Sequence, residues 1–242
     1  MVNYYNSMKI LSIIPARGNS KELPRKNIKF LVGKPLIEYS IAHAKKSQFI
    51  DRIIVSTDSK KIAQISKSLG VEVPFLRPKK ISGDSTPIID VVQHTLNFLE
   101  KNENYIPDIV IVLQPTSPIR NVKKIDESIN LLKKTQCSSV ISVAKVKTTP
   151  SICFWNENNF LKPFDKNFEK LTIRQNRKPL YHPTGSLYVF WAKTLRKYDS
   201  IYGPKIRPML ISNNSENLDV DNLFEFFLSE MTMKYWKKYS KK

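Results

Sequence analysis

Short apolar runs alternate with amphipathic stretches from residue 9 to residue 146 of this sequence. The apolar runs are rich in branched aliphatic residues and predict buried strands at residues 10–14, 53–57, 71–76, 108–113 and 139–146. The amphipathic stretches predict helices at residues 36–46, 60–69, 87–100 and from after Arg120 to Lys134. Because this alternation is typical of βαβ units, we expect an α/β fold: a three-layer sandwich around a mostly parallel sheet.

The alternation stops between residues 148 and 183, in a stretch rich in Pro, Asn, Lys and aromatic residues. This stretch is too apolar for a disordered loop, so we expect an excursion that packs on another surface, plausibly a second subunit. Strands are predicted to resume at residues 185–190 and 207–211, and a last helix at residues 222–239. The length of 242 residues fits a single domain, 1–242, in which we expect 148–183 to be a dimerisation element.

The formal net charge of +19 indicates anionic partners such as a nucleotide, a nucleic acid or an acidic membrane surface. Lysines scattered over surface helices for solubility are the other explanation. No apolar run approaches the roughly 20 residues of a membrane span, and the N-terminus has no hydrophobic signal core. The two cysteines fit no metal or redox spacing, so a cytoplasmic protein without membrane insertion is expected.

A cationic loop, PARGNSKELPRKN, follows the first predicted strand. It carries Arg17, Lys21 and Lys26, and it ends at Asn27. Guanidinium, ammonium and backbone N–H groups can converge there on phosphate oxygens, although a solvated basic loop would look similar. The loop is neither a P-loop nor a dinucleotide-binding turn, because Gly18 is its single glycine.

Polar residues also follow the other predicted strands. Arg77 lies after the third strand with Ser85 and Thr86 nearby, and Gln114 lies after the fourth. The carboxyl ends of parallel strands share one edge of the sheet, where ligands of α/β proteins bind. We therefore expect the active site at this edge.

Asp219 and Asp221 form the main acidic pair of the chain. In an extended segment, residues two apart project to the same side, so these carboxylates would repel unless a cation neutralised them. Mg²⁺ that also binds phosphate oxygens would suit the pair. The alternative is that Asp221 caps the last helix and Asp219 is solvated.

Several segments together resemble the acylneuraminate cytidylyltransferases (CMP-sialic acid synthetases). These are PARGNSKELPRKN, GKPLIEYSI, VSTDS, LQPTSPIR and LDVD, in family order and at family-like spacings. The resemblance implies a Rossmann-like nucleotidyltransferase fold and a homodimer. It also implies a reaction in which the anomeric hydroxyl of a nine-carbon α-keto sugar acid attacks the α-phosphate of CTP. CMP-sugar and pyrophosphate would result, with Mg²⁺ as cofactor.

The resemblance also assigns roles to individual residues, which are expectations at this point. The expected catalytic residues are Lys21, Lys26, Arg174 and Asp221. The expected nucleotide-binding residues are Arg17, Lys21, Asn27, Arg77, Ser85 and Thr86. The expected sugar-binding residues are Gln114, Arg174 and Tyr181, and the expected metal ligands are Asp219 and Asp221.

Thr184 departs from the Asn-Gly that the family usually has in this stretch, so legionaminic-type and pseudaminic-type acids are candidates beside sialic acid. The main alternative function is nucleotidyl transfer to the eight-carbon acid Kdo or to a sugar-1-phosphate. A nucleic-acid-binding module is a remote alternative, because the sequence has no aromatic–basic RNA motif and no helix-turn-helix signature.

Overall fold

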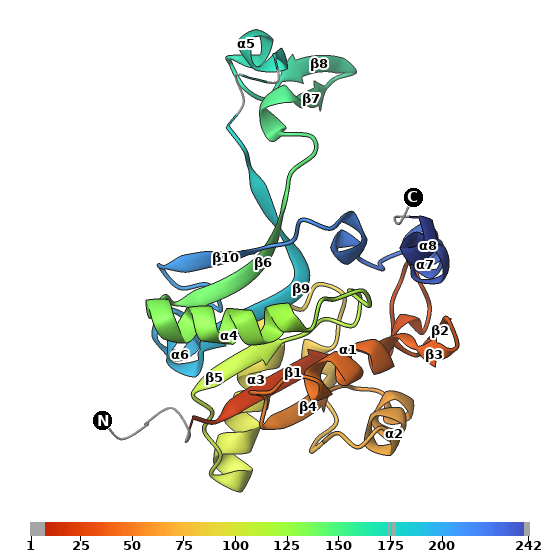
Figure 1. Cartoon of the computed structure of the whole chain (residues 1–242), viewed down its shortest axis with the longest axis vertical. Coiled ribbons are helices and arrows are strands. Elements are labelled where there is room, and N and C mark those ends of the chain that lie inside the picture. The colour runs from red at the N-terminus through yellow and green to blue at the C-terminus, as the bar shows by residue number, and fades with distance from the viewer. Residues whose placement is uncertain (1–7, 174, 176–177, 240–242) are drawn as a thin grey trace.

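The structure is a computed structural model, and it describes residues 8–173, 175 and 178–239. Its centre is a six-stranded sheet with the order β10-β6-β9-β5-β1-β4 (Figure 1). The strands are β1 (Ile10–Pro15), β4 (Arg52–Ser56), β5 (Ile109–Val112), β6 (Ser139–Lys145), β9 (Tyr181–Trp191) and β10 (Ile206–Leu210). The pairs β1–β4, β1–β5 and β10–β6 are parallel, whereas β9 runs antiparallel to β5 and β6. The predicted α/β fold with a mostly parallel sheet is thus confirmed.

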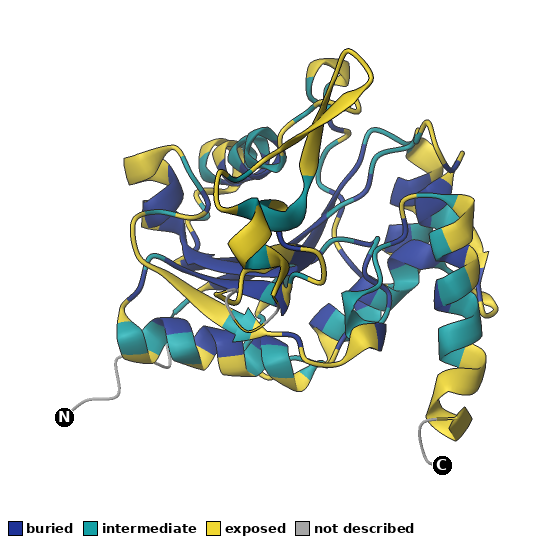
Figure 2. Ribbon diagram, turned by 90° about the horizontal axis from the view of Figure 1, so that it is seen from above, coloured by how far each residue is buried: buried dark blue, intermediate teal, exposed yellow. Residues whose placement is uncertain are grey.

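Helices cover both faces of this sheet, because each strand presents apolar side chains to both faces. Successive side chains of a strand point to opposite faces, so Ile109 and Ile111 of β5 pack in one cluster while Val110 and Val112 pack in the other. The first cluster is completed by α1 (Leu36–Lys45), α2 (Lys60–Ser68) and α4 (Lys123–Thr135). The second is completed by α3 (Ile88–Glu103) and α6 (Ala192–Tyr198). The buried strands lie between helices whose outer sides are exposed (Figure 2).

The predicted strand at residues 71–76 is wrong. In the structure this segment makes only isolated bridges, Ile54 with Glu72 and Thr57 with Leu76. Pro74 lies in the middle of the segment and has no N–H to donate to a ladder, so continuous pairing cannot form there.

The excursion forms an arm (residues 146–180) that projects from the body at the ends of β6 and β9 (Figure 1). It carries the hairpin β7 (Phe154–Glu157) and β8 (Phe160–Pro163), followed by α5 (Phe168–Thr172). Every residue of the hairpin strands is exposed, although most of the sheet strands are buried.

The chain ends in α7 (Leu223–Met231), a π-helical turn (Thr232–Trp236) and α8 (Lys237–Tyr239). Asn222 and Glu225 form a capping box that starts α7. Phe226 of α7 packs in a small cluster with Val220, Leu23, Leu31 and Leu36, so the last helix joins the cationic loop to the Asp219–Asp221 segment. Leu31 belongs to the short pair β2 (Phe30–Leu31) and β3 (Lys34–Pro35). In the described part of the chain, none of the helices has the length and apolar character that crossing a bilayer demands.

Candidate active site

A cavity of about 330 Å³ opens beyond the carboxyl ends of β1 and β5. The polar and charged side chains that line it are Arg17, Lys26, Asn27, Arg77, Thr86, Gln114, Thr116, Asp219 and Asp221. These residues come from five separate segments of the chain. The structure therefore brings most of the predicted site residues to the edge of the sheet where they were expected.

The cationic loop begins at the end of β1 and is held by two polar contacts. The backbone N–H of Gly18 donates to Oδ1 of Asp58 at 2.7 Å, and Nδ2 of Asn27 donates to the carbonyl of Arg17 at 2.8 Å. A Cβ atom at Gly18 would lie 2.9 Å from Cβ of Ser59, so the close approach requires glycine.

Arg17 is paired within the free protein. Its guanidinium lies 2.5 Å from Oδ1 of Asp84 and donates to the carbonyl of Gly83 at 3.2 Å. Nζ of Lys21 is 3.7 Å from the other oxygen of Asp84, and the Lys21 side chain is 84% exposed. One carboxylate, that of Asp84, thus lies within ion-pair distance of two cations of the loop.

Arg77 also lines the cavity, and its side chain is almost fully buried. Its backbone N–H donates to the carbonyl of Thr57, and the nearest carboxylate, Asp58, is 3.9 Å away. Its Nε has no hydrogen-bond partner among the described residues. Burial lowers the pKa of Arg77 from its usual value. A buried guanidinium with an unused donor is suited to a polar or anionic ligand.

Asp219 and Asp221 enter the cavity from the segment before α7. The N–H of the buried Val220 between them donates to the carbonyl of Thr116 at 2.7 Å, which fixes this segment against the loop after β5. Burial raises the pKa of Asp219 and the charge of Asp221 raises it further, whereas Thr116 and Lys26 act in the opposite direction. Asp221 pairs with Nζ of Lys26 at 2.7 Å.

The carboxylate pair fits a divalent cation. Oδ1 of Asp219 is buried and has no hydrogen-bond partner among the described residues, and Asp221 lines the same cavity. No group of three or more His, Cys, Asp and Glu side chains suited to a metal occurs in the part of the chain that is described. Two carboxylates are nevertheless a usual protein contribution to Mg²⁺, which keeps waters and takes substrate phosphate oxygens.

Gln114 follows β5, lines the cavity and packs against Gly185 of β9. A Cβ atom at Gly185 would lie only 2.6 Å from Oε1 of Gln114 and 3.5 Å from Oδ2 of Asp219. Gly185 also has a φ of +72°, a conformation that favours glycine. The Gln114 amide and the Asp219 carboxylate therefore both lie close to Gly185.

Three predicted site residues do not line this cavity. Lys21 and Ser85 are exposed next to it, and Tyr181 is half-exposed where β9 leaves the arm. A fourth, Arg174, lies outside the described residues.

Asp58, Asp84 and Thr116 are not among the predicted site residues, but they position residues that are. Asp58 and Thr116 follow the ends of β4 and β5, so position relative to the strands was the available signal for these two. The pairing of all three, with Gly18, Arg17 and Val220, depends on contacts between distant segments.

Comparison with known proteins agrees with this geometry. A model of the cytidylyltransferase family matches residues 11–203. The chain is 37% identical over 228 residues to a CMP-N,N'-diacetyllegionaminic acid synthase of Legionella pneumophila, covering 93% of this chain and 97% of that protein. It is 31% identical over 228 residues to a pseudaminic acid cytidylyltransferase of Campylobacter jejuni, covering 94% and 97%. An N-acylneuraminate cytidylyltransferase of Escherichia coli is 31% identical over 225 residues, covering 91% of this chain and 51% of that longer protein.

Two solved structures share the fold at low sequence identity. One is a CMP:2-keto-3-deoxy-manno-octonic acid synthetase complexed with CTP, with a TM-score of 0.69, 16% identity and coverage of 93% of this chain and 98% of that chain. The other is a 4-diphosphocytidyl-2C-methyl-D-erythritol synthase of Anaerococcus prevotii, with a TM-score of 0.62, 15% identity and coverage of 94% and 99%. Because the family model matches most of the chain and the relatives align over nearly all of it, this chain belongs to the cytidylyltransferase family of nucleotidyltransferase enzymes.

Proposed function

We propose that the protein transfers CMP from CTP to the anomeric hydroxyl of a nine-carbon α-keto sugar acid and releases pyrophosphate. The observation that carries the proposal is the cavity itself, in which Arg17, Lys26 and Arg77 face the carboxylates of Asp219 and Asp221. Cations for a triphosphate and acids for a metal are both required for nucleotidyl transfer. The relatives named for legionaminic, pseudaminic and N-acylneuraminic acids support the class of acceptor.

The nucleotide half of the site consists of residues of the cationic loop and Arg77. Arg17, Lys21 and Lys26 would bind the phosphates, with Lys21 reaching in from its exposed position. Asn27, Arg77, Ser85 and Thr86 would place the rest of the nucleotide. In the reaction, the anomeric oxygen forms a bond to the α-phosphorus, the hydroxyl proton is lost, and the bond from the α-phosphorus to the oxygen of the leaving pyrophosphate breaks. Lys21 and Lys26 would stabilise the negative charge that moves onto pyrophosphate.

Asp219 and Asp221 would hold Mg²⁺, which supplies charge neutralisation of the phosphates. Asp221 also forms an ion pair with Lys26. The buried Lys26 would stay in the cavity wall, where its ammonium group is available to phosphate oxygens. We expect chelation by EDTA to stop turnover and added Mg²⁺ to restore it.

The sugar half of the site contains Gln114, beside Gly185 and Asp219. Tyr181 at the base of the arm and Arg174 are the other proposed contacts, and Arg174 would recognise the sugar carboxylate bidentately. Arg174 is proposed to reach the site of a second subunit rather than its own.

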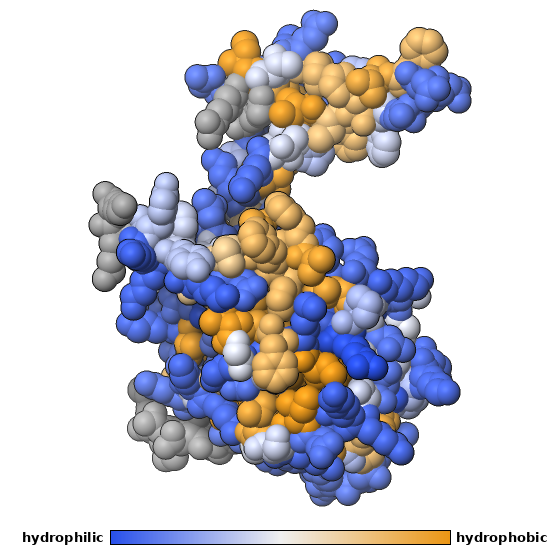
Figure 3. Space-filling view, turned by 90° about the vertical axis from the view of Figure 1, so that its right-hand side faces the viewer, coloured by the Kyte–Doolittle hydropathy of each residue, from blue (hydrophilic) through white to orange (hydrophobic). Residues whose placement is uncertain are grey.

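A homodimer formed through the arm is part of this proposal. The arm exposes Phe154, Trp155, Phe160, Leu161 and Phe164, and an apolar surface of this extent on a projecting element is typical of a protein interface. The space-filling view shows apolar side chains gathered on the arm and on the body below it (Figure 3). A partner subunit would cover these side chains.

Pyrophosphate release tests the proposed reaction. The purified protein is incubated with Mg²⁺, CTP and one of four acids: N-acetylneuraminic, legionaminic, pseudaminic or Kdo. ATP, GTP and UTP replace CTP as controls. Release that requires CTP and one nine-carbon acid would support the proposal and identify the sugar. Turnover of Kdo, or of a sugar-1-phosphate with another nucleotide, would refute the proposed acceptor while leaving the family intact.

A further inference from the structure

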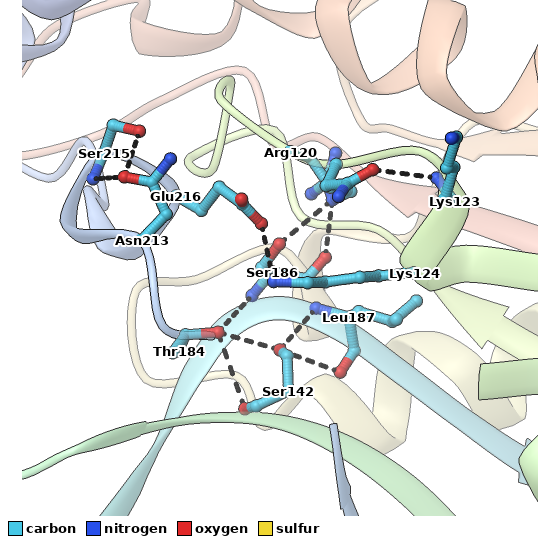
Figure 4. A network of polar contacts seen from close by, with 11 residues as sticks. Arg120, Lys123, Lys124, Ser142, Thr184, Ser186, Leu187, Asn213, Ser215 and Glu216 are labelled. Atoms are coloured by element: carbon cyan, nitrogen blue, oxygen red, sulfur yellow. Dashed lines mark hydrogen bonds and ion pairs between the residues drawn. The ribbon is translucent and has the colours of Figure 1, made fainter. Parts of the chain in front are cut away.

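Arg120 does not line the cavity; it is buried in a network of polar contacts (Figure 4). It belongs to the loop that connects β5 to α4. Its Nε donates to the carbonyl and the hydroxyl of Ser186 at 2.9 and 3.1 Å. Its NH2 donates to the carbonyl of Gln114 at 3.0 Å. One guanidinium therefore joins the loop after β5 to strand β9.

These two joined segments meet at the proposed sugar contact. Gln114 Oε1 rests against Gly185, so closely that a Cβ atom there would lie 2.6 Å away. Arg120 binds the backbone of Gln114 on one side and that of Ser186, next to Gly185, on the other. The position of the Gln114 amide over β9 therefore depends on the spacing that Arg120 sets.

Strand β9 is irregular where Arg120 contacts it. The pairing of β6 with β9 shifts register between Ile141 and Val143. Ser142 lies at this register shift. Its hydroxyl accepts hydrogen bonds from the Thr184 hydroxyl at 2.8 Å and from the N–H of Leu187 at 2.9 Å (Figure 4). The segment of β9 from Thr184 to Leu187 is thus held by side chains in place of a regular ladder, and Arg120 is one of them.

The partners of Arg120 in the described part of the chain are neutral. NH1 lies 3.0 Å from Nδ1 of His43 and 3.4 Å from Oγ of Ser40, and Ser40 itself donates to the Gln114 carbonyl at 3.1 Å. Burial lowers the pKa of Arg120 to about 9, and the charge of Asp219 partly offsets this shift. The guanidinium is therefore still protonated at neutral pH. Burying a cation without a paired carboxylate is costly, which argues for a task beyond stability.

We infer that Arg120 is a positioning residue for the sugar acid, acting through Gln114 and the Gly185–Ser186 backbone that it joins. The inference rests on the proposed function, since it assumes that Gln114 contacts the sugar. Arg120 itself does not line the cavity. Its loss should misplace the Gln114 amide relative to Asp219, and a displacement of about 1 Å in an active site can cost on the order of 100-fold in rate.

The test compares Arg120→Lys and Arg120→Met with wild type, using CTP and an acid that the wild-type protein turns over. Lysine keeps the charge but cannot bridge both carbonyls in the same way. We expect kcat/KM for the acid to fall on the order of 100-fold in both variants, with KM for the acid rising. The affinity for CTP, measured separately by calorimetry, should stay within about twofold. Arg52→Lys is the matched control, because Arg52 is also largely buried but pairs with Glu72 and Glu103 outside the cavity.

A double-mutant cycle separates positioning from a purely structural effect. If Arg120 acts through Gln114, then Arg120→Lys should cost at most about threefold more in a Gln114→Ala background. Full additivity, or an equal loss of affinity for CTP and acid, would overturn the inference. Should the Arg120 variants fail to fold, Ser40→Ala removes the other side-chain donor to the same carbonyl, and an unchanged KM for the acid in that variant would overturn it. A wild-type protein that is inactive with every nine-carbon acid would instead refute the proposed function, and this inference with it.

Discussion

Nζ of Lys26 lies 2.7 Å from Oδ1 of Asp221, although 195 positions separate the two residues in sequence. The Lys26 side chain is only 8% exposed, whereas that of Asp221 is 59% exposed. The cation is thus fixed in the cavity wall, and the carboxylate is the partner that can exchange. A metal or phosphate that enters the cavity competes for this pair.

Lys26→Met should reduce kcat by about 100-fold to 1,000-fold, as is typical for the loss of one group that stabilises transition-state charge. Methionine fills a similar volume, and the partner Asp221 remains in contact with solvent, so the thermal midpoint should change little. Steady-state pyrophosphate release and a thermal melt measure the two quantities. Lys34→Met is the control, because Lys34 forms an ion pair of similar length with Glu38 on the surface. A kcat within threefold of wild type would show that Lys26 has no catalytic role.

Asp84 forms ion pairs with Arg17 and Lys21, both of which are proposed to bind phosphate. Asp84→Asn should therefore tighten the binding of CTP, by about fivefold if the pair is worth the ~1 kcal/mol of a partly exposed ion pair. The gain should shrink at high salt, since screening weakens the interaction that the substitution removes. Calorimetric titration at two salt concentrations measures it. Asp199→Asn, which changes the net charge equally outside the cavity lining, is the control. Weaker binding in Asp84→Asn would mean that Asp84 orders the loop instead of competing with phosphate.

His43 makes stability depend on pH. Burial, Arg120 and Lys46 lower the pKa of His43 to about 3, so Nδ1 stays unprotonated and accepts from Arg120. In the unfolded chain its pKa is about 6.5, and the unfolded state alone therefore takes up a proton as pH falls below that value. Stability from this group is complete above pH 6.5 and declines as pH falls towards 3.

Between about pH 6.5 and pH 5.0, His43 should cost roughly 2 kcal/mol of stability. His43→Gln keeps an acceptor for Arg120 but does not titrate, so its free energy of unfolding should decline less steeply over this interval. Urea unfolding at several pH values measures the difference between the two proteins. His182→Gln is the control for the loss of an exposed histidine. Parallel curves for wild type and His43→Gln would show that His43 is protonated in the folded state.

The sequence predicted which segments form the strands and helices of the fold better than it predicted the direction of each strand in the sheet. Alternating apolar and amphipathic stretches placed β1, β4, β5 and β6 and the helices between them, because βαβ connections force parallel strands. The same pattern does not encode direction for β9, which returns from the arm and inserts antiparallel between β5 and β6. Apolar residues flanking Pro74 predicted a strand that the missing N–H prevents.

The site was predictable to the extent that it follows strand ends. Arg17 follows β1, Gln114 follows β5, and Arg77 follows the isolated bridge that Leu76 makes with Thr57. All three line one cavity. Their partners were not predictable, because Asp84 and Asp58 lie in loops and Gly185 in the antiparallel strand β9, and all three are distant in sequence from the residues they contact. Arg120 belongs to a quoted motif, yet only its burial behind Gln114 indicates what it does.

The arm supplies a prediction about assembly. Phe160 and Leu161 are 78% and 67% exposed at the tip of the hairpin, and a second subunit that covers them would gain apolar burial. The double substitution Phe160→Ser and Leu161→Ser should convert a dimer into a folded monomer, as measured by light scattering on a sizing column. Ile106→Ser, which alters an exposed apolar residue before β5, should leave the dimer unchanged. A wild-type protein that is monomeric at micromolar concentration would contradict the proposed assembly.

If that dimer shares its active sites, two inactive variants should complement each other. Lys21→Ala removes a cation beside the subunit's own cavity, and Arg174→Ala removes the residue proposed to reach the partner's cavity. In a heterodimer of the two variants, one cavity combines both defects and the other has neither. Each heterodimer should therefore recover up to about half of the wild-type activity, because only the cavity with both residues intact is active. Heterodimers are isolated with two affinity tags, and each variant alone is the control. Isolated heterodimers as inactive as the parents would place Arg174 in the cavity of its own subunit.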